Sequence, residues 1–208
     1  MRIIIDADGC PVVDITLRIA IEKEVECHIF CDTCHIFEKD GDEIFSKADA
    51  VVVQVDLAKD IIKKTIELSK KYNKKLFALV SNMSIAAERR DFLQDFDCFI
   101  CNRQEAGILF SDDYSEIPRE ELKYIIEEKV TRANIPAMIV TLGADGAVYA
   151  TNTGERGACP ARKVIVKDTT GAGDAFCAGA SIGLTYGKTF AEAIEIGSRL
   201  AASVITSS

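Results

Sequence analysis

Apolar and polar residues follow two patterns along this chain, short apolar runs and longer stretches with apolar residues at helical spacing. The short runs predict buried β-strands, and the amphipathic stretches between them predict helices. The predicted strands cover residues 2–6, 27–31, 50–55, 75–80, 96–101, 137–141, 147–151 and 164–166. The predicted helices cover residues 11–23, 57–72, 85–92, 104–110, 118–133, 171–186 and 190–205. This alternation predicts the α/β class, with a parallel sheet covered by helices.

Composition and charge limit the class of protein but do not indicate a particular function. The 208 residues are 48% hydrophobic, which is enough for the core of one domain. No run of about eighteen apolar residues occurs, so we expect no membrane partner. The chain begins directly with a predicted strand and without the long apolar region of a signal peptide, which favours a cytoplasmic location. The net charge of −8 argues against a general nucleic-acid binder.

Cysteines are numerous, and they lie at positions 10, 27, 31, 34, 98, 101, 159 and 177. The pairs Cys31/Cys34 and Cys98/Cys101 have the two-residue gap of a zinc site. Cys98 and Cys101 fall in a predicted strand, however, where residues three apart point to opposite faces and cannot hold one ion. Reduced thiols packed as small apolar side chains are the favoured interpretation.

The string Asp168-Thr-Thr-Gly171-Ala172-Gly173-Asp174-Ala-Phe176 joins a predicted strand to a predicted helix. Backbone N–H groups and the positive end of the helix dipole converge at such a turn, which suits a phosphate. The two glycines lack a Cβ atom and allow close approach of an anion. Asp174 would lie beside the phosphoryl group, where it could accept a proton from an attacking hydroxyl. The alternative is a glycine-rich turn in which Asp174 only caps the helix.

A second motif, Asn102-Arg-Gln-Glu105, follows a predicted strand and begins a helix. Its amide and carboxylate oxygens are suitable for organising magnesium through ordered water. The alternative is an ordinary helix start with an asparagine cap.

A third motif, Thr141-Leu-Gly143-Ala-Asp-Gly146, lies between two predicted strands. Its glycines make a turn that a nucleotide can approach, and the Thr141 hydroxyl can reach a phosphate. The alternative is a simple hairpin turn.

The string from Asp168 to Phe176 resembles the second signature of the ribokinase-like, or PfkB, family of carbohydrate kinases. The two upstream motifs are similar to that family's N-x-x-E and T-L-G-x-x-G segments and occur in its order. The resemblance covers about residues 48–208. It implies a three-layer α/β/α, Rossmann-like fold with a mostly parallel sheet, and ATP-dependent phosphorylation of a sugar or nucleoside hydroxyl with Mg²⁺. Members of the family often form homodimers through a β lid.

The resemblance also implies a role for each motif. Asp174 corresponds to the catalytic base. The remaining positions fall into three groups. These are an anion hole of Gly171, Ala172 and Gly173, nucleotide contacts at Thr141, Gly143, Gly146 and Thr169, and water-mediated magnesium contacts at Asn102 and Glu105.

Residues 1–47 have a different pattern and lack both the β lid and the glycine-rich first signature of these kinases. They resemble the start of the YaiI/YqxD-like family, which is thought to be related to PIN-type nucleases. Asp6, Asp8 and Asp32 follow predicted strands and could bind a metal at a sheet edge, or Asp6 and Asp8 could simply cap the next helix.

Together the two resemblances indicate a natural fusion, a truncated and restarted gene, or an engineered chimera. We expect one α/β domain with a continuous sheet across residues 46–49. Three functions stay open: a kinase with reduced activity, a catalytically weak nucleotide-binding domain, and a metal-dependent nuclease.

Overall fold

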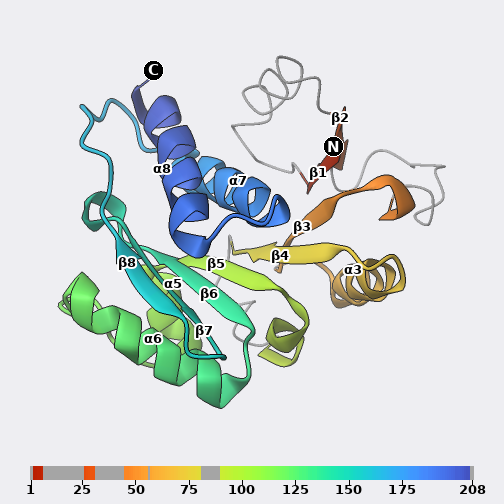
Figure 1. The fold of residues 1–208 in the computed structure, drawn as a ribbon, viewed down its shortest axis with the longest axis horizontal. Helices are drawn as coiled ribbons and strands as arrows, with labels where there is room; N and C mark the ends of the chain where they lie inside the picture. The colour runs from red at the N-terminus through yellow and green to blue at the C-terminus, as the bar shows by residue number, and fades with distance from the viewer. Residues whose placement is uncertain (1, 7–25, 31–44, 56, 81–89, 207–208) are drawn as a thin grey trace.

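A computed structural model describes residues 2–6, 26–30, 45–55, 57–80 and 90–206 (Figure 1). Its main feature is a six-stranded sheet in the order β3-β4-β5-β6-β7-β8. The first four strands pair in parallel, and the last two are antiparallel additions. The bounds are β3 (Ala50–Gln54), β4 (Lys75–Leu79), β5 (Cys98–Asn102), β6 (Ala137–Thr141), β7 (Ala147–Thr151) and β8 (Arg156–Cys159). The predicted mostly parallel α/β sheet is confirmed.

The N-terminal strands form a separate sheet. β1 (Arg2–Asp6) and β2 (Glu26–Phe30) pair in parallel, and β1 lies near β3. Among the described strands, however, no backbone pairing joins the two sheets. The structure therefore differs from the expected continuous sheet across residues 46–49. The helix predicted at 11–23 lies outside the described residues.

Helices cover both faces of the large sheet, as Figure 1 shows. One layer contains α3 (Lys59–Lys71), α5 (Arg103–Phe110) and α6 (Arg119–Ala133), and the other contains α7 (Ala172–Thr185) and α8 (Phe190–Thr206). The side chains of β5 alternate between them: Phe99 and Cys101 pack toward α5 and α6, and Cys98 and Ile100 pack toward α7 and α8. The three-layer α/β/α architecture is thus confirmed.

The layer of α7 and α8 is held together by small residues. A Cβ atom on Gly179 would lie 2.7 Å from the Cα of Gly197, and one on Gly183 would lie 2.8 Å from the Cα of Ala193. The two helix backbones therefore approach closely, and the position of α7 over the sheet is fixed by its neighbour.

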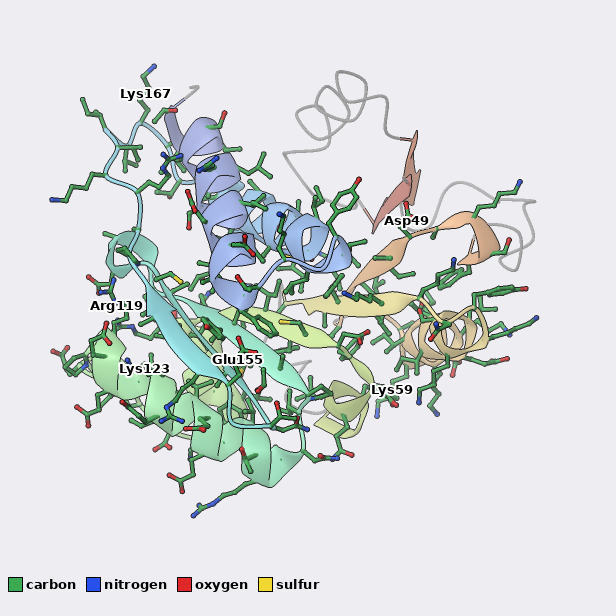
Figure 2. All side chains as sticks on the ribbon, in the orientation of Figure 1. Asp49, Lys59, Arg119, Lys123, Glu155 and Lys167 are labelled. Carbon is green, nitrogen blue, oxygen red and sulfur yellow. The ribbon has the colours of Figure 1, made fainter. Side chains whose placement is uncertain are left out.

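The prediction of a buried strand at residues 164–166 is wrong. Val164 and Val166 are exposed, and Ile165 is 86% exposed. β8, which was not predicted, forms the edge of the sheet instead, and Pro160 follows it without an N–H to continue the ladder. The chain then runs to the C-terminal end of α8, and Figure 2 shows Lys167 near this end. There the Lys167 N–H donates to the Ile205 carbonyl at 2.9 Å.

The short helix predicted at 85–92 is described only from residue 90, where the 3₁₀ helix η1 (Arg90–Asp95) begins. No helix in the described part of the chain is both long and apolar enough to cross a bilayer.

The described cysteines behave as packed thiols. Cys98, Cys101, Cys159 and Cys177 are thiols and not disulfides, and Cys98 and Cys101 lie in different core clusters on opposite faces of the sheet. Burial raises the pKa of the Cys98 and Cys101 thiols, which keeps them protonated. The prediction that these two cannot hold one ion is confirmed, whereas the Cys31/Cys34 pair lies outside the described residues.

Candidate functional site

Two of the three motifs meet at the carboxyl edge of the parallel strands. Asn102 is the last residue of β5 and Thr141 is the last residue of β6, and the two are partners in the strand register. Ligands of open α/β sheets bind outside this edge. The structure therefore brings the Asn102–Glu105 and Thr141–Gly146 motifs together where a ligand is expected.

Asn102 and Glu105 form a complete capping box at the start of α5. The Asn102 Oδ1 atom accepts from the Glu105 N–H at 2.8 Å, and the Asn102 N–H donates to Glu105 Oε2 at 2.6 Å. Burial raises the pKa of the Glu105 carboxyl, and the hydrogen bond from Asn102 partly offsets this. The asparagine cap considered as an alternative is thus present, and it fixes both side chains at the sheet edge.

This arrangement fits magnesium held through water. The capping box uses one Glu105 carboxylate oxygen and leaves the other to accept from a bound water. No group of three or more His, Cys, Asp or Glu side chains suited to a metal occurs among the described residues. Mg²⁺ commonly keeps several waters and takes only one or two protein carboxylates together with substrate phosphates.

The Thr141–Gly146 segment is a compact turn between β6 and β7, containing the 3₁₀ helix η2 (Gly143–Asp145). The Leu142 N–H donates to the Gly146 carbonyl at 2.7 Å, and the Thr141 hydroxyl donates to the Cys101 carbonyl at 3.4 Å. The predicted hairpin is therefore confirmed. A weak bond of this length leaves the Thr141 hydroxyl able to turn to another acceptor.

The two glycines of this turn have different surroundings. Gly146 has φ +98°, and a Cβ atom there would lie 2.0 Å from the Cys159 carbonyl oxygen at the end of β8. A Cβ atom on Gly143, whose φ is +59°, would meet nothing within 4 Å. Gly146 is therefore needed for packing, and only Gly143 has open space beside it.

The turn before α7 begins the helix as predicted. Gly171 is the N-cap with φ +75°, and Asp174 lies in the first turn. The Ala172 N–H donates to the Thr169 carbonyl at 3.1 Å, and Asp168 Oδ1 accepts from both the N–H and the hydroxyl of Thr170 at 2.9 Å. These bonds lower the pKa of Asp168 and hold the turn in shape. A Cβ atom on Gly173 would meet nothing within 4 Å.

A single lysine shows which way α7 points. Lys75, the first residue of β4, donates from Nζ to the Leu184 carbonyl near the end of α7 at 2.5 Å. The end of α7 therefore lies at the amino edge of the sheet, and its beginning points toward the carboxyl edge. The turn containing Gly171–Asp174 faces the same edge as Asn102 and Thr141.

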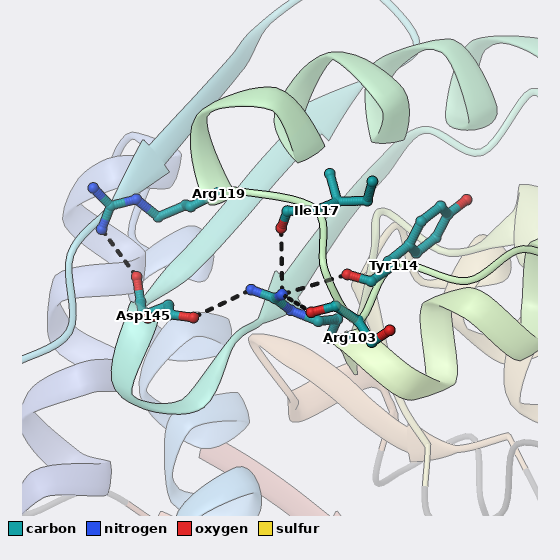
Figure 3. Close-up of polar contacts among 6 residues, drawn as sticks. Arg103, Tyr114, Ile117, Arg119 and Asp145 are labelled. Atoms are coloured by element: carbon teal, nitrogen blue, oxygen red, sulfur yellow. Dashed lines mark hydrogen bonds and ion pairs between the residues drawn. The ribbon is translucent and has the colours of Figure 1, made fainter.

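Two arginines that the sequence analysis did not select hold the Thr141–Gly146 turn (Figure 3). Arg103 Nη2 lies 3.3 Å from Asp145 Oδ2, and Arg119 Nη1 donates to the Asp145 carbonyl at 2.9 Å. Both arginines are the first residue of a helix, where a cation is disfavoured by the dipole. That unfavourable placement indicates that each arginine needs another partner, but the sequence does not indicate that the partner is Asp145.

The candidate nuclease residues cannot be assembled from the described part of the chain. Asp6 ends β1, but only its backbone is described. Asp8 and Asp32 lie outside the described residues. The metal-binding cluster of these three carboxylates stays a prediction.

Comparisons with known proteins agree with both resemblances. The family described as pfkB family carbohydrate kinase matches residues 20–208, so the match begins earlier than the predicted residue 48. The guanosine-inosine kinase of Exiguobacterium acetylicum is 36% identical over 160 residues, which are 76% of this chain and 52% of the kinase. The chain thus spans about half the length of this curated relative.

A UPF0178 protein of Exiguobacterium sibiricum is 51% identical over 41 residues in the N-terminal segment, 20% of this chain and 27% of that protein. Among solved structures, Arabidopsis thaliana ribokinase complexed with ribose and ATP superimposes with a TM-score of 0.70 and 22% identity. That superposition covers 83% of this chain and 55% of the ribokinase, and it shows a shared fold.

Proposed function

Because the chain belongs to the pfkB family of carbohydrate kinases, we propose that it transfers the terminal phosphoryl group of ATP to a hydroxyl of a sugar or nucleoside. One observation carries the proposal. The glycine turn that opens α7 points toward the sheet edge where Asn102 and Thr141 are register partners. A site for phosphates and a candidate base are thereby directed to the same edge.

In the proposed reaction, Asp174 accepts the proton of the acceptor hydroxyl. The acceptor oxygen forms a bond to the terminal phosphorus while the bond from that phosphorus to the bridging oxygen breaks, and ADP leaves. The backbone N–H groups at Gly171 and Gly173, at the positive end of α7, stabilise charge on the phosphoryl oxygens. The Ala172 N–H, which donates to the Thr169 carbonyl, joins them by sharing that bond. Positioning and charge stabilisation supply most of the rate in this chemistry.

The nucleotide would contact Thr141, Gly143 and the exposed Thr169, with Gly146 shaping the turn. Asn102 and Glu105 would hold Mg²⁺ through water, and the bound ion would neutralise phosphate charge. The acceptors to test first are guanosine and inosine, because the relative at 36% identity is a guanosine-inosine kinase, followed by ribose. The homodimer, the single domain and the cytoplasmic location stay predictions.

A second candidate is a nucleotide-binding domain with weak or no turnover. It is favoured by the coverage of 52% of the guanosine-inosine kinase, since an acceptor site can lie in the remaining part of such an enzyme. ATP binding without ADP release across the acceptor panel would establish it.

The test measures ADP release from ATP and Mg²⁺ with a panel of sugars and nucleosides. Asp174→Asn should lower kcat by a factor of about 10² or more, as expected for loss of a general base. Asp60→Asn is the matched control, because Asp60 is also an acid in the first turn of a helix and should leave kcat unchanged. Equal kcat values for the wild type and Asp174→Asn would contradict the role of Asp174.

Magnesium-dependent nucleic-acid cleavage that Asp6→Ala abolishes and Asp174→Ala spares would support the nuclease instead.

A further inference from the structure

The Arg103 guanidinium lies between the start of α5, the segment after α5, and the η2 turn (Figure 3). Nη1 is 2.8 Å from the Ser115 carbonyl oxygen and 3.3 Å from those of Tyr114 and Ile117. Nη2 is 3.3 Å from Asp145 Oδ2. One side chain therefore joins three segments of the carboxyl edge.

Asp145 is held by a second cation through its main chain. Arg119, the first residue of α6, donates from Nη1 to the Asp145 carbonyl at 2.9 Å. Asp145 is thus fixed at its side chain from α5 and at its backbone from α6. The turn cannot rotate about either contact alone.

The turn moves as a unit because its own backbone bonds close it. The Asp145 N–H donates to the Leu142 carbonyl at 3.1 Å, and the Gly146 N–H donates to the Gly143 carbonyl at 3.2 Å. The contacts of Arg103 and Arg119 with Asp145 therefore also fix the position of Gly143.

These contacts contribute to geometry more than to global stability. The Arg103 side chain is 21% exposed and that of Asp145 is 69% exposed, and ion pairs this open to water add little to the free energy of unfolding. Arg103 also lies at the positive end of the α5 dipole, which opposes its charge. Its fixed fork of donors can nevertheless set the distance between α5 and the turn.

We propose that Arg103, acting through Asp145, is a positioning residue that aligns the Thr141–Gly146 turn with the Asn102–Glu105 motif for nucleotide binding. This inference rests on the proposed function. Arg103 is the residue directly after Asn102, so its contact with Asp145 connects the proposed magnesium site to the proposed nucleotide site. In this proposal Arg103 acts through Asp145 and not by contact with a substrate.

The test uses Arg103→Gln, Arg103→Lys and Asp145→Asn, with Arg132→Gln as the matched control. Arg132 is also an arginine paired with an acid, but it bonds Glu128 on the exposed face of α6. The first readout is amide hydrogen exchange of residues 142–146 in the protein without ligand. Exchange should become faster in Arg103→Gln and Asp145→Asn and stay unchanged in Arg132→Gln.

The second readout is the Kd for ATP, together with the separate effects of each variant on KM and on kcat. Arg103→Gln should raise the Kd and KM for ATP roughly 3- to 10-fold, with a smaller change in the KM of the acceptor. Arg103→Lys should recover only part of this loss, because an ammonium group has three donors and cannot reach all four acceptors of the guanidinium. The double variant with Asp145→Asn should lose less than the product of the two single changes.

Unchanged exchange in the turn together with an unchanged Kd for ATP would overturn the proposal. A lower melting temperature with the same exchange and the same KM for ATP would assign Arg103 a structural role and overturn it as well. If Arg103→Gln fails to fold, the exposed Asp145→Asn variant decides between these outcomes. A wild type that binds no ATP would refute the proposed function, and faster exchange would then still show that Arg103 holds the turn.

Discussion

At the scale of single residues, the two glycines of the Thr141–Gly146 turn look alike in the sequence but differ in what they permit. Gly146 combines positive φ with direct contact to the backbone after β8, whereas Gly143 has positive φ and open space. Substitution by alanine therefore separates the cost of backbone strain from the cost of a steric clash.

Gly146→Ala should lower the free energy of unfolding by about 1–3 kcal/mol from backbone strain, with a further loss from the clash with Cys159. Gly143→Ala should cost only about 1–2 kcal/mol, because nothing opposes its methyl group. Urea denaturation of both variants measures the difference. Equal losses would show that the close approach of Gly146 to β8 is not maintained in solution.

The Glu105 carboxyl predicts a pH dependence of stability. Burial raises its pKa in the folded state above the unfolded value of 4.5. Below 4.5 both states are protonated, and as pH rises through the folded pKa the folded state must ionise a partly buried group and loses stability. Glu105→Gln keeps a capping-box side chain and should reduce this loss.

The measurement is urea denaturation from pH 4 upward for the wild type and Glu105→Gln. Glu67→Gln is the control, because Glu67 is an exposed glutamate paired with Lys64. A pH profile that changes equally in both variants would rule out burial of Glu105 as the cause.

Residues that form local motifs are the ones that the sequence predicts. Asn102, Glu105 and Gly171–Asp174 could be predicted because each acts within one turn of its own helix. Arg103 and Arg119 could not, since they contact Asp145 across 42 and 26 residues of sequence. A contact of that kind depends on strand order, which a motif does not contain.

At the scale of elements, the parallel strands could be predicted from the sequence, but the edge strand β8 could not. Strands buried on both faces are continuous apolar runs, as in residues 98–101 of β5. β8 has no such run, and its Gly157 lies against the ring of Tyr149, where a Cβ atom would come within 2.5 Å. Residues 164–166 have a strand-like composition, but they are exposed and pair with no strand in the described part of the chain.

The close packing of α7 on α8 predicts a strong effect of one methyl group. Gly179→Ala would place its Cβ atom 2.7 Å from Gly197 and should lower the free energy of unfolding by about 1–3 kcal/mol through overpacking. Gly173→Ala, at the open first turn of the same helix, should leave stability unchanged or raise it by up to about 1 kcal/mol. Thermal unfolding compares the two, and an equal loss in both would contradict the packing argument.

At the scale of the whole molecule, nucleotide binding should appear as stabilisation. ATP and Mg²⁺ at about 100 times the Kd should raise the free energy of unfolding by about 2.7 kcal/mol, or the melting temperature by roughly 5–10 °C. Gly173→Ala should lose most of this increase, because its methyl group would occupy the proposed phosphate site while the fold stays intact. The same increase in both proteins would show that the nucleotide does not bind at the start of α7.

The overall architecture followed from the alternation of strands and helices, but the relation between the two N-terminal strands and the large sheet did not. Either a continuous sheet or two sheets satisfies the same apolar pattern. The direction of α7, which brings the glycine turn to the carboxyl edge, also depended on the long-range contact of Lys75.

The contact between Lys75 and Leu184 joins residues 109 positions apart, and this has a consequence for synthesis on the ribosome. A nascent chain can complete β3 to β6 and expose Asn102 and Thr141 before α7 has left the ribosome. During that interval the apolar face that α7 and α8 later cover is open to other proteins. The growing chain should therefore bind chaperones most strongly just before α7 leaves the exit tunnel, and the turn proposed to hold phosphate should form late.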